Sequence, residues 1–355
     1  MTRRFATHGS DAFNAWMEER VAEIAADAAR ALGGNLVALV LGGGYARGEG
    51  GVVRVDGREL PYNDLDFTVI VRGSKRAAAD ALAEVSRKHH PIVGIDVDFS
   101  RPLTVDDVRR WPHWLMWTDL LAGHRVVQGA EDALTANAPA RLKGSPPLIE
   151  GTRLLLNRGA GLLWASLVLA GAEPAPDPTF VERNLHKCAL AIGDSLIIAA
   201  GRHRTRYEGR DAILAELVEE RFQGFADMLA PYRDALRFRL EPGEPLVRDA
   251  AAARTLLAGR WRDALLETEG IRAGRSFAGA AEYAAWPALR EPELHTPARR
   301  VKNLLLNARG GKLSTRYPRE RLYAMLPTTL GASTGAPGPW VEDARAALAL
   351  WRRYN

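Results

Sequence analysis

The spacing of hydrophobic residues in the first part of the chain predicts helices alternating with strands. Residues 11–32 have apolar positions at helical intervals between Ser10, a candidate N-cap, and a Gly-Gly pair at which the helix would end. The run 35–41 (NLVALVL) is short, continuous and rich in branched residues, which is typical of a buried strand. The runs 64–71 (DLDFTVIV) and 92–99 (IVGIDVDF) predict two further strands, separated by a helix over 75–89.

Beyond residue 147 the pattern is helical throughout. The expected helices are 148–171, 178–201, 209–229, 245–266, 296–309 and 338–353. The sequence therefore predicts an α/β (α+β) domain with a small mixed sheet over residues 1–145, followed by a larger all-α domain over residues 146–355.

Composition places the chain among ordinary globular proteins, with 47% hydrophobic and 26% charged residues in 355. The most apolar stretches are interrupted by polar residues and are better explained as buried helices than as membrane spans. Cys188 is the only cysteine, which excludes an internal disulfide and fits a reducing compartment. We therefore expect a cytoplasmic protein with no membrane partner.

The net charge of +5 permits a polyanionic partner such as RNA, but the positive charge is scattered and no basic block interleaved with aromatics indicates one. Only six of the 48 basic residues are lysines, as expected when a GC-rich genome favours arginine codons. A lysine that is retained is a better candidate for a position that needs a compact ammonium.

A glycine-rich turn follows the first predicted strand. Gly43 and Gly44 allow the backbone to approach a ligand and to point N–H groups at it. The turn is not a Walker loop, because no Lys-Ser/Thr follows Gly48. It also fails the dinucleotide fingerprint, because Arg47 stands where that motif needs glycine.

Carboxylates follow on the next two strands. Alternate strand residues face the same side, so Asp64 and Asp66 lie side by side, as do Asp96 and Asp98 on the third strand. Adjacent carboxylates repel one another unless a cation neutralises them. A phosphate-binding turn beside such a cluster suits two magnesium ions, or manganese, that hold a nucleoside triphosphate.

The run LGGGYARGEG…NDLDFTVIV…GIDVDF resembles the polymerase-beta-type nucleotidyltransferase superfamily. The resemblance covers less than a third of the chain. It implies that Gly43 and Gly44 bind the triphosphate and that Asp64 and Asp66 hold both metals. Arg47, in the same turn, is a further candidate for binding the nucleotide.

The third carboxylate of that pattern would hold the catalytic metal and assist deprotonation of the acceptor. The family pattern favours Asp96 for this role, and Asp98 on the same face is the alternative. A predicted hairpin over 52–62, centred on Asp56-Gly57, lengthens the interval between the glycines and the first aspartate. The acceptor specificity of smaller members therefore does not transfer directly.

In the helical region, Lys187 is the candidate for holding the outer phosphates of the nucleotide. The competing interpretation is a buried pair between Lys187 and Asp194, which are seven residues apart on one helix. Lys302 and Lys312 form a weaker phosphate candidate, against which a solvated helix face must be weighed.

These inferences predict a nucleotidyltransferase that moves a nucleoside monophosphate, with AMP as the first choice, from a triphosphate to an acceptor hydroxyl. The acceptor is a small molecule or a protein, and the sequence does not identify it. Two alternatives remain: a terminal transferase or polymerase acting on RNA, and a nucleotide-binding regulator without catalytic activity.

Overall fold

The computed structural model describes residues 4–243, 247–333 and 335–354 and divides the chain into two compact units. The first unit comprises Met1–Pro147 together with two later segments, His203–Arg210 and Leu236–Glu244. The second unit comprises Leu148–Arg202, Asp211–Ala235 and Pro245–Asn355. The sequence prediction placed a single boundary at residue 145 and gave no sign that the chain returns to the first unit.

A small mixed sheet forms the centre of the first unit, as the sequence predicted. Its strand order is β5-β4-β1-β6. Strand β1 runs antiparallel to β4 and β6, whereas β4 and β5 are parallel. The four strands are β1 (Leu36–Leu41), β4 (Leu65–Val71), β5 (Val97–Phe99) and β6 (Arg125–Gly129).

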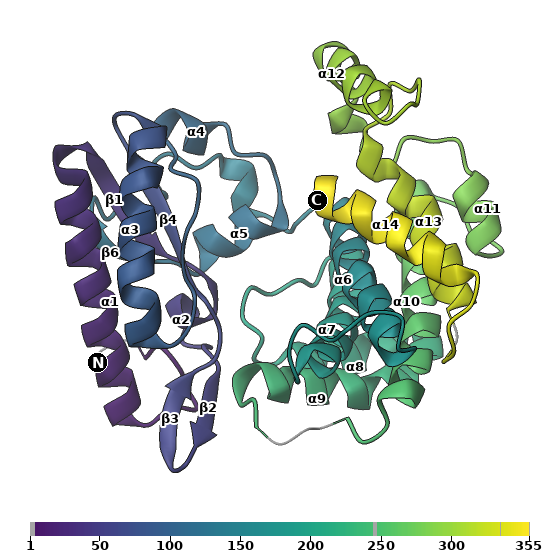
Figure 1. Ribbon diagram of the computed structural model, residues 1–355, viewed down its shortest axis with the longest axis horizontal. Coiled ribbons are helices and arrows are strands. Elements are labelled where there is room, and N and C mark those ends of the chain that lie inside the picture. The colour runs from purple at the N-terminus through teal and green to yellow at the C-terminus, as the bar shows by residue number, and fades with distance from the viewer. Residues whose placement is uncertain (1–3, 244–246, 334, 355) are drawn as a thin grey trace. The chain divides into compact units, whose positions relative to one another are not determined.

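Helices cover both faces of this sheet (Figure 1). Helices α1 (Asp11–Leu32) and α3 (Lys75–Val93) lie over the face that carries Leu39, Leu41 and Val69. Helices α4 (Val105–Arg109) and α5 (Leu115–Ala122) lie over the opposite face, which carries Val40 and Ile70. Burial on both sides explains why β1 and β4 read as continuous apolar runs instead of alternating patterns.

The predicted strand over 92–99 is too long. Helix α3 continues through Pro91 and ends at Gly94, whose φ of 78° gives the left-handed cap that favours glycine. The helix tolerates Pro91 in its last turn, and Val93 still reaches the core. Only Val97–Phe99 remain for β5. The sequence prediction also missed β6, α4 and α5, which are short elements.

The predicted hairpin is present as β2 (Val52–Val55) paired with β3 (Arg58–Pro61). Asp56 and Gly57 have φ values of 49° and 75°, as a two-residue turn with both central residues left-handed requires.

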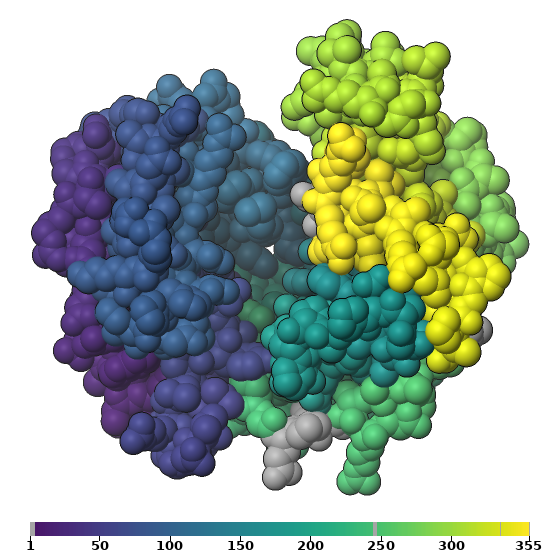
Figure 2. Space-filling view, viewed as in Figure 1, coloured from purple at the N-terminus to yellow at the C-terminus, as the bar shows by residue number. Residues whose placement is uncertain are grey.

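The described part of the second unit contains helices and no strand, which agrees with the all-α prediction there. Helices α9, α11 and α13 were not predicted. In Figure 2 the yellow α14, which packs against α6 and α13, covers part of the surface of this unit. The helices from α6 onward are α6 (Leu148–Leu169), α7 (Phe180–Ala199), α8 (Arg210–Glu220), α9 (Leu229–Leu240), α10 (Ala250–Ala273), α11 (Ala280–Ala285), α12 (Pro297–Ala308), α13 (Arg321–Ala332) and α14 (Trp340–Tyr354). None of the helices in the described ranges has the length and apolar character needed to cross a bilayer.

Candidate active site

The glycine-rich turn after β1 forms one short helix, α2 (Gly43–Arg47), that is fixed against β4. The N–H of Gly42 donates to the carbonyl of Asp66 at 2.8 Å, so the turn begins beside that aspartate. Gly48 ends the helix with a φ of 84°. The turn and the Asp-x-Asp strand therefore form one local structure.

Tyr45 ties the same turn to the hairpin strands. Its buried hydroxyl accepts the N–H of Tyr62 at 3.0 Å and donates to the carbonyl of Gly51 at 2.8 Å. Burial raises the pKa of Tyr45 to about 12, so the hydroxyl keeps its proton and both hydrogen bonds at neutral pH. This anchor limits the freedom of the turn before any ligand binds.

Gly43 and Gly44 have different surroundings. Gly43 has a φ of 66°, and a Cβ at this position would lie 2.6 Å from Oδ2 of Asp66. Gly44 is buried, and a Cβ there would lie 2.9 Å from the carbonyl oxygen of Glu49. Gly43 therefore borders the acidic group, whereas Gly44 lets the turn pack on itself.

Two carboxylates lie side by side where β4 and β5 begin, and a third precedes β4. Asp66 and Asp98 are direct partners in the parallel register, and Asp64 precedes β4 by one residue. Burial raises the pKa of the Asp66 carboxyl to about 6, and the negative charges of Asp64 and Asp98 add to the rise. The positive charges of Arg239 and Arg47 act in the opposite direction without cancelling it.

Asp96 does not belong to this group. Its Oδ1 lies 3.1 Å from Nδ1 of His90 on α3, and its backbone carbonyl accepts the N–H of Leu65. Asp96 precedes the first residue of β5. The structure pairs Asp98, and not Asp96, with Asp66, so we favour Asp98 for the third carboxylate, and the role of Asp96 stays a prediction.

A cavity of about 520 Å³ opens in front of the carboxylates. One side is acidic, with Asp66 and Asp98, and another is apolar, formed by Met116, Trp117 and Leu120 of α5. Trp117 stacks on the buried Trp111 with ring centroids 4.2 Å apart, which fixes this wall. The lining residues all belong to the first unit and are Gly42, Gly43, Arg47, Asp66, Phe67, Thr68, Asp98, Phe99, Ser100, Met116, Trp117, Asp119 and Leu120.

Arg47 supplies positive charge at this cavity. Its side chain is 8% exposed, and its Nε lies 3.4 Å from Oε2 of the buried Glu49. The other oxygen of Glu49 accepts the backbone N–H of Glu208 at 3.1 Å, which ties the returning segment to the turn. Glu49 thus holds Arg47 while leaving its guanidinium at the cavity wall.

Arg239 is a second cation that sequence reasoning missed. It lies in the last turn of α9, in the part assigned to the first unit, and its charge acts on both Asp66 and Tyr45. The Arg239 guanidinium stacks 4.3 Å from the ring centroid of Tyr207, which Arg210 also approaches at 4.2 Å. Its Nε is buried and has no hydrogen-bond partner among the described residues.

Lys187, the predicted phosphate ligand, occupies an exposed position of α7 in the second unit. Its role stays a prediction. Asp194 on the same helix is buried and accepts the hydroxyl of Tyr232 at 2.7 Å. Cys188 is fully buried, and burial raises the pKa of its thiol, so it is unsuited to act as a nucleophile.

The side chains of Asp64, Asp66 and Asp98 are chemically suited to bind a divalent cation. No three described His, Cys, Asp or Glu side chains are already gathered closely enough to hold a metal ion. The repulsion that raises the pKa of Asp66 is nevertheless the kind that a bound cation relieves. Asp64, Asp66 and Asp98 fit magnesium by donor chemistry and would turn their carboxylates toward it on binding.

Comparison with known proteins adds nothing to this assignment, because no protein-family model, curated protein or solved structure matches the chain. The residues of the site and the sequence pattern that forms it are therefore the basis for proposing a function.

Asp66→Asn should stabilise the metal-free protein by about 1 kcal/mol at pH 7.5, a figure discounted for solvent screening. The folded-state pKa of about 6 lies above the unfolded value of about 3.9, so ionisation of Asp66 above pH 6 destabilises the native state. The gain should shrink between pH 6 and pH 4 and vanish below that range. Urea unfolding in EDTA across pH 4–8 measures it, with the exposed Asp96→Asn as control. An equal gain in unfolding free energy from both variants would contradict the raised pKa of Asp66.

Proposed function

We propose that the chain is a divalent-metal-dependent nucleotidyltransferase that transfers a nucleoside monophosphate, with AMP as the first choice, to an acceptor hydroxyl. The observation that carries the proposal is the pair Asp66 and Asp98 at the wall of one cavity, beside the left-handed Gly43 and within the electrostatic reach of Asp64. A binding module has no need for carboxylates that repel one another. A phosphoryl-transfer site needs them to hold cations.

In this proposal the carboxylates of Asp64, Asp66 and Asp98 hold magnesium. Bound magnesium neutralises phosphate oxygens and stabilises charge during in-line displacement at phosphorus. Gly43 leaves room for a phosphate close to Asp66, since it carries no side chain there. Arg47 and Arg239 offset the remaining negative charge of the triphosphate.

The reaction exchanges one phosphorus–oxygen bond for another. The acceptor oxygen forms a bond to the α-phosphorus while the bond to the bridging oxygen breaks, and pyrophosphate leaves. The acceptor hydroxyl loses its proton, and Asp98 is the chain's candidate to receive it, because it lies beside Asp66 and lines the cavity.

The apolar wall formed by Met116, Trp117 and Leu120 supports binding of a nucleoside or of the organic part of the acceptor. Met116 is 57% exposed, which is high for a large apolar side chain and leaves it accessible to a ligand. Such a surface offers stacking and burial without base-specific hydrogen bonds. The choice of AMP therefore rests on the sequence resemblance and not on this wall.

Pyrophosphate release tests the proposed function. The protein is incubated with each nucleoside triphosphate and magnesium or manganese, with and without a metabolite extract, an RNA extract or a protein extract. We expect extract-dependent release that is absent from an Asp64→Asn/Asp66→Asn double variant. The extract that supports turnover distinguishes a small-molecule acceptor from RNA or a protein. Triphosphate binding with no pyrophosphate above the double-variant blank would instead indicate a nucleotide-binding regulator.

Gly43→Ala should abolish turnover, because the new methyl group meets the Asp66 carboxylate and forces it to rotate. Gly57→Ala is the matched control: Gly57 is also left-handed, but a Cβ there meets nothing within 4 Å. Both changes should cost about 1–2 kcal/mol in unfolding free energy from backbone strain. We expect turnover to fall at least 100-fold in Gly43→Ala and to stay within twofold in Gly57→Ala. Similar turnover in the two variants would show that Gly43 does not border the reacting group.

A further inference from the structure

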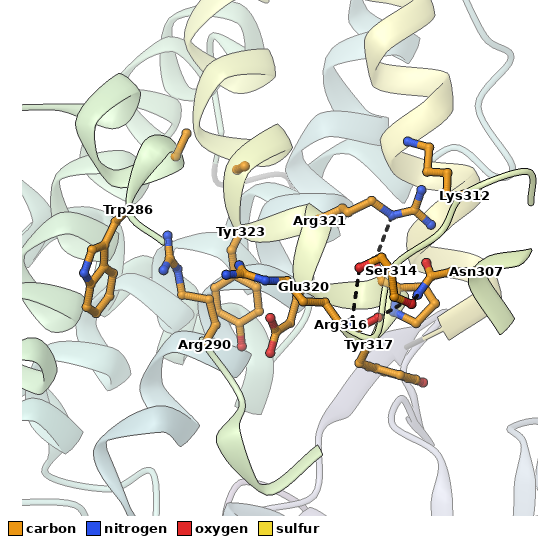
Figure 3. Close-up of a pocket in the computed structure, with 13 residues that line it drawn as sticks. Trp286, Arg290, Asn307, Lys312, Ser314, Arg316, Tyr317, Glu320, Arg321 and Tyr323 are labelled. Atoms are coloured by element: carbon orange, nitrogen blue, oxygen red, sulfur yellow. Dashed lines mark hydrogen bonds between the residues drawn. The ribbon is translucent and has the colours of Figure 1, made fainter. Parts of the chain in front are cut away.

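A second pocket, of about 200 Å³, lies wholly within the second unit. It is formed by α11, the start of α13 and the segment that follows α12 (Figure 3). In Figure 3, Glu320 and Tyr323 lie in the middle of the lining residues, with Trp286 on one side and Lys312 on the other. The lining residues are Ala284, Trp286, Arg290, Asn307, Lys312, Ser314, Arg316, Tyr317, Pro318, Glu320, Arg321, Tyr323 and Ala324.

Three buried polar atoms at this pocket have no hydrogen-bond partner among the described residues. They are Oε2 of Glu320, the hydroxyl oxygen of Tyr323 and Nε of Arg290. These residues are 6%, 1% and 4% exposed, respectively. A buried polar group without a partner costs about 1–3 kcal/mol. The three atoms belong to residues that line one cavity but have almost no accessible surface themselves, so a ligand completes their hydrogen bonds only if the side chains that carry them rotate toward it.

The groups around these atoms are held in place. Oε1 of Glu320 lies 2.6 Å from Nε2 of His295 and accepts the N–H of Glu291 at 3.1 Å. The terminal nitrogens of Arg290 donate to the backbone carbonyls of Tyr283 and Ala288. Burial raises the pKa of Tyr323 well above its usual value, so its hydroxyl remains available as a donor. These hydrogen bonds hold the Glu320 carboxylate and the Arg290 guanidinium from the protein side.

The rim of the pocket is cationic. Lys312, Arg316 and Arg321 line it, and none of them forms an ion pair with a carboxylate in the described ranges. The surrounding stretch from Leu294 to Arg319 contains no Asp or Glu, and Arg319 is its one arginine or lysine with a described carboxylate partner, Glu291. The other arginines and lysines of the stretch are Arg299, Arg300, Lys302, Arg309, Lys312 and Arg316. Two of the chain's few lysines lie here. The excess positive charge calls for an anionic ligand group.

Two buried asparagines fix the segment that supplies part of this rim. The Asn307 amide donates to the carbonyls of Ser314 at 2.8 Å and Arg316 at 2.7 Å. The Asn303 amide donates to the carbonyls of Leu294 and Thr315. The inner face of α12 therefore holds the rim through hydrogen bonds, which preorganises it for binding.

We propose that this pocket binds a small monophosphate ester whose other end carries a hydroxyl or amino group. The phosphate meets Lys312, Arg316 and Arg321, and the donor at the other end meets Oε2 of Glu320. The rings of Trp286 and Tyr317 contact the carbon skeleton between the two ends. A volume of about 200 Å³ suits a compact metabolite.

This proposal does not depend on the nucleotidyltransferase activity. The pocket shares no lining residue with the cavity at Asp66, and its occupancy is measured by binding without any turnover. If the pocket binds no ligand, the proposed reaction is unaffected. If the proposed reaction is not observed, the pocket can still bind its ligand.

Isothermal titration with ribose 5-phosphate, phosphoethanolamine, inorganic phosphate and ribose tests the ligand class. We expect at least one ester to bind at least tenfold more tightly than inorganic phosphate and ribose to show no binding. Lys312→Gln should weaken ester binding at least fivefold. Lys302→Gln, on the same cationic stretch but outside the pocket, should change it less than twofold. Equal losses from both variants, or no saturable binding of either ester, would overturn the proposal.

Tyr323→Phe separates a ligand role from a packing role. It removes a hydroxyl that has no described partner and should leave the melting temperature unchanged or higher. We expect ester affinity to fall several-fold while inorganic phosphate binding is unchanged. A lower melting temperature with unchanged ester affinity would show that the hydroxyl serves the fold instead.

Discussion

The concentration of negative charge around Asp66 is the constraint on which the candidate site depends. Strand pairing sets Asp66 directly beside Asp98, and Asp64 adds a third carboxylate one residue before the strand. Burial, and after it the charges of Asp64 and Asp98, raise the pKa of Asp66, and two nearby arginines act against the rise without cancelling it. Ionisation of Asp66 costs the fold stability at neutral pH, and we propose that a bound divalent cation offsets this cost.

Part of the positive charge that acts on the carboxylates comes from residues distant in the sequence. Arg47 comes from the turn beside the carboxylates, but Arg239 and Tyr207 come from segments that return to the first unit after long helical stretches. Glu49 links the two sources, because it contacts Arg47 and also accepts the backbone N–H of Glu208. The first unit is therefore complete only when these later segments are folded onto it.

The sequence predicted the elements that are determined by neighbouring residues. The apolar runs of β1 and β4, the Asp-Gly hairpin and the helical second half follow from periodicity and turn chemistry. The sequence leaves the choice between Asp96 and Asp98 open, because both fall on one face by alternation and only the backbone pairing of Asp98 with Asp66 distinguishes them. Gly94 marks the end of α3, but Pro91 obscured this local signal. No local pattern records that Arg239 returns to the first unit.

Manganese binding measured by electron paramagnetic resonance tests the central claim most directly. The account predicts saturable binding to the wild-type protein in the presence of a non-hydrolysable triphosphate. Binding should weaken at least tenfold in Asp98→Asn and remain within twofold of wild type in Asp96→Asn. Absence of saturable binding to the wild-type protein, or equal losses in the two variants, would contradict the assignment of these carboxylates to a metal site.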